Sequence, residues 1–520
     1  MTVNRREFLI GSSLVLAAGA GALAKRDAFA AENSDLQKRL ASDPRRPQYH
    51  LLPAANWIND PNGPIFWNGR YHMFYQYNPN AAVWGDMHWG HAVSPDTIHW
   101  KHLPIALSPT PGGPDAAGCF SGTAVVDRGV VTVLYTGVVS APEDQATIKD
   151  GPRSYRESQC LATSTDPELK TWFKLPAPVI RKPPVDLEVT GFRDPSPWRK
   201  GDSWYMTVGA GLPHKAGEVL LYRSADLRHW DYQHLVAQGE GAGDEKSDPV
   251  ASGDMWECPD LFPLDGMHVL IYSTQGKVHW QSGHLDESAM KFKPERSGIL
   301  DYGSYYAAKS QLDEHGNRIL WGWITESRPV EEYRAAGWAG MMSLPRVLSL
   351  DPDGRLRMEV SPAAHVLRQR EQTCNSGVND GKGAAQLGAM KIENCCGEIH
   401  CVLRPGSEPV TLSLVGTQAG QELPDPLVRL KIDPRSPDQV FVDEQAIPIA
   451  GSGQHAVEVH IYLDGSVAEI ILSRIVAHTK RFYCKGPQAP SVALRLQGHA
   501  HHLRVSMWQI APISPDRLTG

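Results

Sequence analysis

Clustered basic charge, metal-binding cysteine spacings and helical periodicity are all scarce in this 520-residue sequence. The formal net charge is −7 and no basic patch stands out, so neither nucleic acid nor an anionic membrane surface is expected as the main partner. The eight cysteines follow no Cys-x-x-Cys or Cys/His spacing, which argues against a zinc site. Between residues 45 and 350 apolar residues almost never recur with a helical period, so this region is not a helical bundle.

The N-terminal residues differ in composition from the rest of the chain. Arg5 and Arg6 precede an apolar run from Phe8 to Ala24, and Ala28-Phe29-Ala30 forms an A-x-A peptidase site. Residues 1–30 resemble a twin-arginine export signal, whereas an uncleaved anchor helix would need a longer and less interrupted run. We expect cleavage after Ala30, no membrane attachment afterwards, and a protein that works in the periplasm or is secreted.

Short alternating apolar runs fill residues 45–352, and turn-forming residues break them about every eight to twelve residues, which predicts β-strands throughout. A weak repeat lies over this pattern. Each unit opens on a polar or acidic turn, continues through a short apolar strand and then enters an aromatic-rich strand. The five openings are NDPNG, GCFSG, FRDPS, WECPD and DYGSY. Five units of about four strands each predict a five-bladed β-propeller rather than a single β-sandwich, because sandwiches do not repeat in this way.

Three of the units continue into a second hairpin of one kind, written SPDTIHW, STDPELKTW and SADLRHW. We expect the Ser and Asp to form the turn and the Trp to bury the strand that follows. The matching positions are Ser94, Asp96 and Trp100; Ser164, Asp166 and Trp172; and Ser224, Asp226 and Trp230.

The pattern changes after residue 352. Residues 353–372 are predicted to be a linker with a short helix from Ala363 to Arg370, and residues 31–44 an N-terminal extension. Residues 373–520 predict a β-sandwich, because EIHCVLRP, VTLSLVG and VEVHIYLDGSVAEIIL alternate with period two and lack acidic openings. The predicted fold class is therefore all-β, with a five-bladed β-propeller over residues 45–352 and a C-terminal β-sandwich.

The openings of the five units are expected to converge, because the first strand of each propeller blade lines the central channel. Asp60, Asp194, Glu257 and Asp301 occupy equivalent openings in four units, with Phe120-Ser121 in the other. Two carboxylates across a pocket rich in Trp and Tyr are the usual equipment for cleaving a glycosidic bond.

The two catalytic roles require that two similar acids differ in pKa. We expect burial against Trp256, Phe262 and the neighbouring acids to raise the pKa of one of them. The ionised acid would then attack the anomeric carbon, and the protonated acid would donate to the leaving oxygen.

Each motif also has a structural interpretation when it is taken alone. Asp-Pro in NDPNG and RDPSP is a common turn dipeptide, and WECPD fits a strand end. Arg193 next to Asp194 fits a local ion pair, although it could also hold a sugar hydroxyl or tune a neighbouring carboxylate. A nucleophilic role for Cys258 is disfavoured, because no base is identifiable beside it.

Together and in this order, WINDPNG (Trp57–Gly63), FRDP (Phe192–Pro195) and WECPDLF (Trp256–Phe262) resemble the three signature acids of glycoside hydrolase family 32. This family comprises invertases, inulinases, levanases and fructan exohydrolases. Further matches, which extend the resemblance over residues 46–350, are YHMFYQYNP, MHWGHAVSPDTIHW, GCFSGTAV, DYGSYYAAKS, ILWGW and SLPR.

The resemblance implies a role for each matching residue. Asp60 would be the nucleophile that forms a covalent fructosyl-enzyme, and Glu257 the general acid that later serves as base for water. Asp194 would hold two fructose hydroxyls and favour the oxocarbenium-like transition state. The rest of the fructose pocket would comprise Asn59, Gln76, Trp84, Phe120, Ser121 and Arg193. The family's fold, a propeller followed by a sandwich, agrees with the repeat, and its members need no metal and no organic cofactor.

The sequence departs from the family pattern in three places. Ile58 stands where Met is frequent, a change of similar bulk, and Ile471 replaces a common Phe in the predicted sandwich. The segment from Val138 to Glu157 matches nothing in the family pattern, and loops of this kind shape substrate choice.

The sequence thus predicts an exported, retaining β-fructosidase that removes terminal fructose from sucrose or a fructan. One alternative is a fructosyltransferase, in which another sugar replaces water at the second step. Another is a sugar-binding protein that has lost the chemistry, which the intact Asp60, Asp194 and Glu257 argue against. The sequence leaves open the linkage preference, endo or exo action, disulfide pairing and the oligomeric state.

Overall fold

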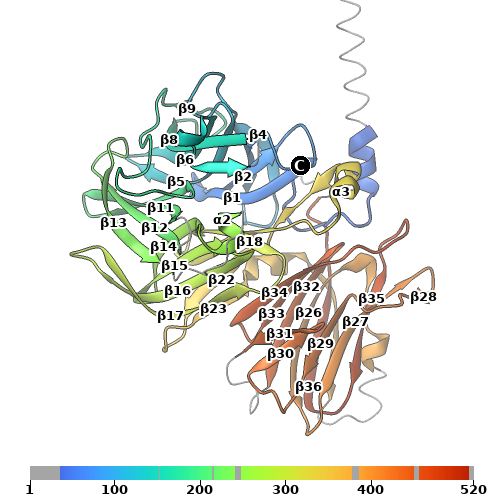
Figure 1. Cartoon of the computed structure of the whole chain (residues 1–520). Helices are drawn as coiled ribbons and strands as arrows, with labels where there is room; N and C mark the ends of the chain where they lie inside the picture. Colours follow the sequence, from blue (N-terminus) through green and yellow to red (C-terminus); the bar gives the residue numbers. More distant parts are fainter. Residues whose placement is uncertain are drawn as a thin grey trace, which may run out of the picture.

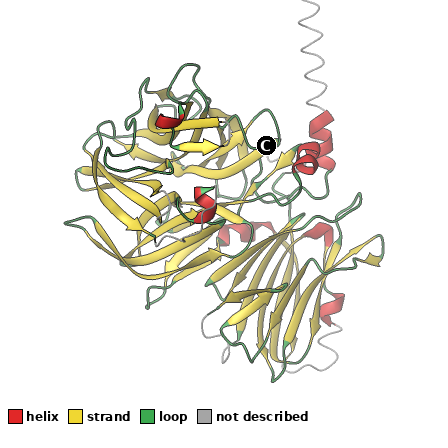
Figure 2. Ribbon diagram, in the orientation of Figure 1, coloured by secondary structure: helices red, strands yellow, loops and turns green. Residues whose placement is uncertain are grey.

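The computed structural model describes residues 35–150, 153–212, 216–239, 248–376, 386–449 and 456–514. The predicted export signal and its cleavage site lie outside the described residues. Nearly all regular structure in the described ranges is β-strand, with a few short helices (Figure 2). None of the helices in these ranges is long and apolar enough to cross a membrane.

The strands of the first two thirds of the chain form mainly antiparallel sheets in chain order. The first sheet contains β1 (Asn56–Trp67), β2 (Arg70–Asn78), β3 (His88–Ser94) and β4 (Lys101–Leu107), with the short β20 (Trp338–Ala339) beside β1. The second contains β5 (Gly118–Asp127), β6 (Val130–Ser140), β7 (Ile148–Asp150), β8 (Arg153–Ser164) and β9 (Phe173–Lys174). The third contains β10 (Phe192–Lys200), β11 (Ser203–Leu212), β12 (Ala216–Ser224) and β13 (Asp231–Gln238).

Two further groups of strands complete this region. One contains β14 (Glu257–Leu264), β15 (Met267–Thr274), β16 (Lys277–Asp286) and β17 (Lys291–Asp301). The other contains β18 (Tyr305–Leu312), β19 (Arg318–Ile324), β21 (Met341–Met342), β22 (Arg346–Leu350) and β23 (Leu356–Val360), so the last strand lies within the residues predicted as a linker. The opening strands are in contact around a closed ring in the order β1, β5, β10, β14, β18 and back to β1. The predicted all-β fold and its propeller-like arrangement are confirmed (Figure 1).

The C-terminal strands gather beside this ring (Figure 1). One set contains β24 (Arg368–Ser376), β26 (Cys396–Pro405), β32 (Val457–Asp464), β33 (Val467–Leu472), β34 (Val476–Arg481) and β36 (Ala500–Ile510). A second sheet contains β25 (Lys391–Ile392), β27 (Val410–Gln418), β28 (Gln421–Glu422), β29 (Val428–Ile432), β30 (Gln439–Val442), β31 (Gln445–Pro448) and β35 (Ser491–Gln497). Apolar side chains from both sets form one buried cluster, as the alternating pattern of the sequence requires.

The helices of the described residues are short. They are a helix at 35–42, η1 (Glu143–Gln145), α2 (Pro249–Ser252), α3 (Val330–Ala336), η2 (Pro362–Leu367), a turn of helix at 386–389 and η3 (Glu393–Cys395). The helix predicted from Ala363 to Arg370 corresponds to η2, which ends at Leu367 because Arg368 already belongs to β24.

Each opening strand carries an irregularity at the same place. The register against the neighbouring strand shifts between Ile58 and Pro61, Phe120 and Gly122, Arg193 and Ser196, Glu257 and Asp260, and Tyr306 and Lys309. A bulge of this kind twists the strand and re-aims the side chains within it. The backbone adopts positive φ at Asp194, Cys258 and Ala307, at 67°, 51° and 54°. The acids therefore lie inside bulged strands, which corrects the prediction that they sit in turns before the strands.

The bulges also show that one predicted position was wrong. Asp301 is the last residue of β17, and Tyr306 is the residue beside the bulge of the fifth opening strand. Asp301 is fully buried and lies 2.9 Å from the Arg346 guanidinium, and it accepts hydrogen bonds from the backbone and hydroxyl of Thr479. Matching the units by their acids placed the opening of the fifth unit at the end of β17 instead of in β18. Asp301 therefore does not line the pocket.

The same buried network joins the two halves of the chain. Arg346 also contacts Glu469 at 2.6 Å, and the ring of His50 lies 2.9 Å from Asp464 and 3.0 Å from Glu469. All of these side chains have no exposed surface. Beside them, β17 pairs with β34 through Asp301 and Ala477, so one continuous sheet of ten strands crosses between the halves.

The Ser-Asp-Trp hairpins form as the sequence predicts. Asp96 accepts hydrogen bonds from the backbone of Ile98 and His99, and the Trp100 indole donates to the carbonyl of Thr97 at 3.0 Å. The other two hairpins repeat the indole bond, from Trp172 to Leu169 and from Trp230 to Leu227. The indole therefore closes the turn as well as covering the strand.

Candidate active site

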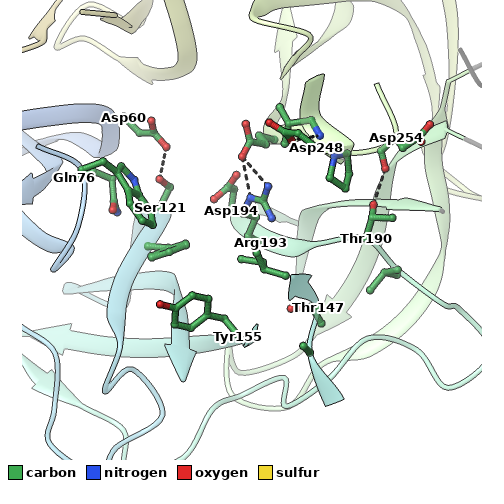
Figure 3. A pocket seen from close by; sticks show the side chains of 18 of the residues that line it. Asp60, Gln76, Ser121, Thr147, Tyr155, Thr190, Arg193, Asp194, Asp248 and Asp254 are labelled. Carbon is green, nitrogen blue, oxygen red and sulfur yellow. Dashed lines mark hydrogen bonds and ion pairs between the residues drawn. The ribbon is translucent and has the colours of Figure 1, made fainter. Parts of the chain in front are cut away.

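All nine residues that the sequence predicts for the site line a single cavity of about 1340 Å³. They come from β1, β2, β5, β10 and β14 and from the loop that holds Trp84. Figure 3 labels five of them, Asp60, Gln76, Ser121, Arg193 and Asp194. The nine are Asn59, Asp60, Gln76, Trp84, Phe120, Ser121, Arg193, Asp194 and Glu257. Residues more than 190 positions apart in sequence are thus brought together, because the bulged opening strands meet at one end of the ring.

Asp60 is held by neutral donors. The Ser121 hydroxyl donates to one carboxylate oxygen at 2.6 Å, and the Asn59 amide donates to the other at 3.0 Å. Asn59 is itself oriented by the Trp57 indole, which donates to its carbonyl oxygen at 2.8 Å. Burial raises the pKa of Asp60, and the nearby charge of Glu257 adds to this effect, whereas the two hydrogen bonds oppose it.

Asp194 is the most enclosed of the three acids, with an exposed fraction of 2%. The backbone N–H of Cys258 donates to its carboxylate at 2.8 Å. Burial raises the pKa of Asp194 to about 7, and the charges of Glu257 and Asp60 act in the same direction against the opposing effect of Arg193.

Glu257 is held by charged and phenolic donors. Arg193 donates from Nε and Nη2 to one carboxylate oxygen at 3.0 and 2.8 Å, and the Tyr306 hydroxyl donates to the other at 2.7 Å. The third donor of Arg193, Nη1, contacts Glu157 at 3.0 Å. The guanidinium therefore pairs with Glu257 and Glu157, and it orients the carboxylate of another strand rather than forming the local pair with Asp194.

The apolar neighbours expected to raise a carboxyl pKa lie elsewhere. The Trp256 ring stacks on Tyr272 with centroids 3.7 Å apart, and Phe262 packs beneath the Arg318 guanidinium at 4.6 Å. Neither side chain lines the cavity. In a strand, successive side chains point to opposite faces, so the residue next to Glu257 points away from it. Burial in the pocket and mutual repulsion of the acids raise the pKa of Asp60 and Asp194. The raised pKa therefore includes that of the predicted nucleophile, whereas the sequence predicted it only for the proton donor.

The thiol of Cys258 lies between two acids, 3.7 Å from Asp60 and 3.5 Å from Asp194. Burial and the two carboxylates raise the pKa of this thiol well above its ordinary value, so it does not ionise to a nucleophilic thiolate. In the part of the chain that the structure describes, Cys119, Cys160, Cys395, Cys401 and Cys484 are, like Cys258, free thiols. No group of three or more His, Cys, Asp and Glu side chains in the described ranges is arranged to hold a metal ion.

The aromatic side of the cavity is formed by Trp84 and Phe120. Trp84 is 52% exposed, and its ring stands edge-on to Phe120 with centroids 5.9 Å apart. Gln76 is fixed by a hydrogen bond from its amide to the carbonyl of Cys119 at 3.0 Å. An exposed aromatic face at the mouth of a polar cavity suits the apolar face of a sugar ring.

Sequence reasoning missed the residues that act across strands. Tyr306 and Glu157 hold Glu257 and Arg193, but neither stands next to a signature acid in the sequence. The segment Val138–Glu157, which matched no family motif, supplies one wall of the cavity through residues 143–148 and Tyr155. Thr147 pins this wall, because its hydroxyl donates to Glu157 at 2.8 Å and accepts from the Glu157 N–H at 3.0 Å.

Two carboxylates with different hydrogen-bond partners line one cavity of this propeller-like all-β fold. This arrangement is typical of the class of glycoside hydrolases. Comparison with known proteins identifies the family. The domain described as "Glycosyl hydrolases family 32 N-terminal domain" matches residues 50–360. The chain belongs to this family and is an enzyme of the β-fructofuranosidase type.

Three relatives illustrate the similarity. A sucrose-6-phosphate hydrolase of Escherichia coli is 38% identical over 67% of this chain and 71% of its own length. A raffinose invertase of Escherichia coli is 39% identical over 63% of this chain and 67% of its own length. The structure of a β-fructofuranosidase of Bombyx mori is 28% identical, superposes with a TM-score of 0.73, and covers 95% of this chain and 99% of its own.

Proposed function

We propose that the protein hydrolyses terminal β-D-fructofuranosyl bonds of sucrose or a fructan with retention of configuration. The observation that carries this proposal is the contrast between two carboxylates in one cavity. Asp60 is held by two neutral donors, whereas Glu257 is held by Arg193 and Tyr306. A Bombyx mori β-fructofuranosidase variant has been solved in complex with sucrose, which supports this choice of substrate.

In the first step Asp60 attacks the anomeric carbon of fructose. The bond to the leaving sugar breaks, and its oxygen takes a proton from Glu257. In the second step water attacks the same carbon, gives a proton to Glu257 and releases Asp60. Asp194 accepts hydrogen bonds from fructose hydroxyls and stabilises the positive charge that develops in both steps.

The roles of the two acids can be tested by substitution. Asp60→Ala and Glu257→Gln are each expected to lower kcat on sucrose by roughly 10³-fold or more, because each removes a group that acts only in the chemical steps. Asp127→Asn, an acid of β5 outside the cavity, serves as the matched control. If either variant unfolds at the wild-type temperature and keeps a wild-type kcat, the substituted acid does not have the catalytic role proposed for it.

The stereochemistry provides a second test. Retention requires the two carboxyl groups to lie about 5 to 5.5 Å apart, whereas inversion requires about 6.5 to 9.5 Å. NMR of the first fructose released should therefore show the β-anomer. Transfer products that dominate at high sucrose concentration would instead favour the fructosyltransferase alternative.

We also propose that the five groups of strands up to β23 are the five blades of a propeller and that the C-terminal strands form a sandwich. The closed ring of contacts among opening strands and the cluster shared by the two C-terminal sheets support this architecture. Residues 1–30 are proposed to direct export through the twin-arginine route. Changing Arg5→Lys and Arg6→Lys should retain the enzyme in the cytoplasm, which cell fractionation would detect.

A further inference from the structure

We propose that the cavity selects uncharged saccharides and excludes substrates that carry a phosphate ester. This inference rests on the proposed function, since it specifies the substrate class of the same site. It also separates this chain from those relatives whose names include a sugar phosphate.

The first argument is the charge of the lining. Among the described residues, eight acidic residues and one basic residue line the cavity. The carboxyl groups belong to Asp60, Glu143, Asp144, Glu188, Asp194, Asp248, Asp254 and Glu257, and the cation is Arg193. The acids come from β1, from the 143–148 segment, from β10 and the residues before it, from β14 and from the residues beside α2, so a phosphate on either sugar of a disaccharide would approach several of them.

The second argument is that Arg193 already forms ion pairs with two carboxylates of the protein. Its Nε, Nη1 and Nη2 groups all donate to Glu257 or Glu157, and its side chain is only 12% exposed. A phosphate could bind this guanidinium only by displacing Glu257, which the reaction needs in place. The described lining therefore offers no cation for a phosphate dianion, which is usually bound by Arg or Lys.

The third argument concerns α2, whose first turn lies at the cavity wall. Free backbone N–H groups at a helix start could bind an anion. Here the Asp248 carboxylate caps them, accepting from Val250 at 2.9 Å and from Ala251 at 3.4 Å. A negative group therefore occupies the place that an anion would take.

The same acidic lining that repels a phosphate can bind the hydroxyl groups of a neutral sugar. Ionised carboxylates accept hydrogen bonds but donate none, and each sugar hydroxyl has a proton to donate. The described cavity adds neutral polar side chains, among them Tyr155, whose hydroxyl can donate or accept, and Thr190, whose hydroxyl donates to the Asp254 carbonyl at 2.7 Å and can still accept (Figure 3). A phosphate dianion brings acceptor oxygens and no proton, so it loses these interactions and meets repulsion.

The test compares sucrose with sucrose-6-phosphate on the purified full-length protein at pH 7 and low ionic strength. We expect kcat/KM for sucrose to exceed that for sucrose-6-phosphate by at least about 100-fold, since like-charge juxtaposition costs several kcal/mol. We also expect the difference to narrow at 0.5 M NaCl, because salt screens partly exposed charges. Equal or faster cleavage of the phosphorylated sugar would overturn the inference and leave the proposed function intact, whereas cleavage of neither sugar would remove the proposed function itself.

A variant tests the stated cause. Glu143→Gln, Asp144→Asn and Asp248→Asn together remove three charges, and Asn is as good a helix cap as Asp. We expect the kcat/KM of sucrose-6-phosphate relative to sucrose to rise at least tenfold. The control removes three acids outside the cavity, through Asp127→Asn, Glu168→Gln and Glu295→Gln, and should leave this ratio unchanged. A ratio that rises equally in both proteins, or in neither, would contradict the inference. If the first variant does not fold, the salt dependence of the wild-type ratio decides.

Discussion

At the scale of the residue, Asp194 shows that an acid of the site can lower the stability of the native state. Its carboxyl group is nearly inaccessible to bulk water and lies close to two other acids. Its pKa is raised to about 7 from an ordinary value of 3.8. Between pH 3.8 and about 7 the unfolded chain has released this proton while the native state still holds it. The free energy of unfolding therefore falls as the pH rises through this range.

Asp194→Asn is accordingly expected to stabilise the protein above pH 7 while it abolishes activity. Asn resembles the protonated acid, so the gain should be near zero at pH 4 and should grow to about 2 kcal/mol at pH 8. Thermal unfolding of both proteins across this range measures it. An equal gain at pH 4 and pH 8 would show that the charge of Asp194 is not the cause.

Tyr306 offers a second test at this scale. Tyr306→Phe removes the hydroxyl that donates to Glu257 at 2.7 Å and keeps the ring in place. This bond stabilises the carboxylate that forms as Glu257 gives up its proton. Because a hydrogen bond to a charged group contributes about 1.5–3 kcal/mol, kcat should fall roughly ten- to a hundredfold. Tyr205→Phe, on β11 and outside the cavity, is the control, and a similar fall in both variants would contradict a role at Glu257.

The residues of the site were predictable to different degrees for a physical reason. Asp60, Asp194 and Glu257 lie in short contiguous motifs, and so do Asn59 and Arg193 beside them. Tyr306 and Glu157 act through contacts between strands that are far apart in the sequence, and no local pattern marks such contacts. The placement of residues was predicted, but the pairing of Arg193 with Glu257 needed the structure.

At the scale of the element, the repeated bulge is the feature that the sequence reading lacked. The all-β strand pattern and the Ser-Asp-Trp hairpins were predicted correctly from alternation and turn residues. Asp301 was misplaced because acids were used to align the units, whereas the feature that the five opening strands share is a register shift, which in the fifth follows Tyr306. A bulge leaves only a weak mark in sequence, since residues other than Gly occupy its positive φ positions here.

The segment from η1 to β8 is an element whose role can be measured. Thr147→Val removes the hydroxyl that binds Glu157 twice and keeps the β-branched shape. We expect KM for sucrose to rise several-fold and kcat to change less, because the wall of the cavity loosens while the acids stay in place. Thr163→Val on β8, away from the cavity, is the matched control. A loss confined to kcat would contradict a role for this segment in binding.

At the scale of the whole molecule, the buried charges between the two halves set a pH window for stability. Burial opposes the charge of His50, but the hydrogen bonds that its ring donates to Asp464 and Glu469 raise its pKa to about 9. Burial also opposes the charge of Glu469, but Arg346 and His50 lower its pKa to about 2. The contribution of His50 is therefore complete below its ordinary pKa of 6.5 and is lost as pH rises through 9. That of Glu469 is complete above 4.5 and is lost as pH falls towards 2.

His50→Gln tests this window. Removing one partner of a buried charged network should lower the free energy of unfolding at pH 6 by roughly 3 kcal/mol. The difference from wild type should shrink at pH 10, where wild-type His50 has lost its proton. Denaturant unfolding at the two pH values measures both effects, and a difference that is the same at pH 6 and pH 10 would show that His50 is neutral throughout.

The same network limits how the gene can be shortened. A product ending at residue 352 would retain Asp301, Arg346 and His50 but would lose Thr479, Glu469 and Asp464, which neutralise or bind them. The charged side chains of Asp301, Arg346 and His50, which are buried in the full chain, would then be exposed without their partners. Engineers who seek a minimal catalyst should therefore keep both halves, or supply the missing one as a separate polypeptide in the same cell.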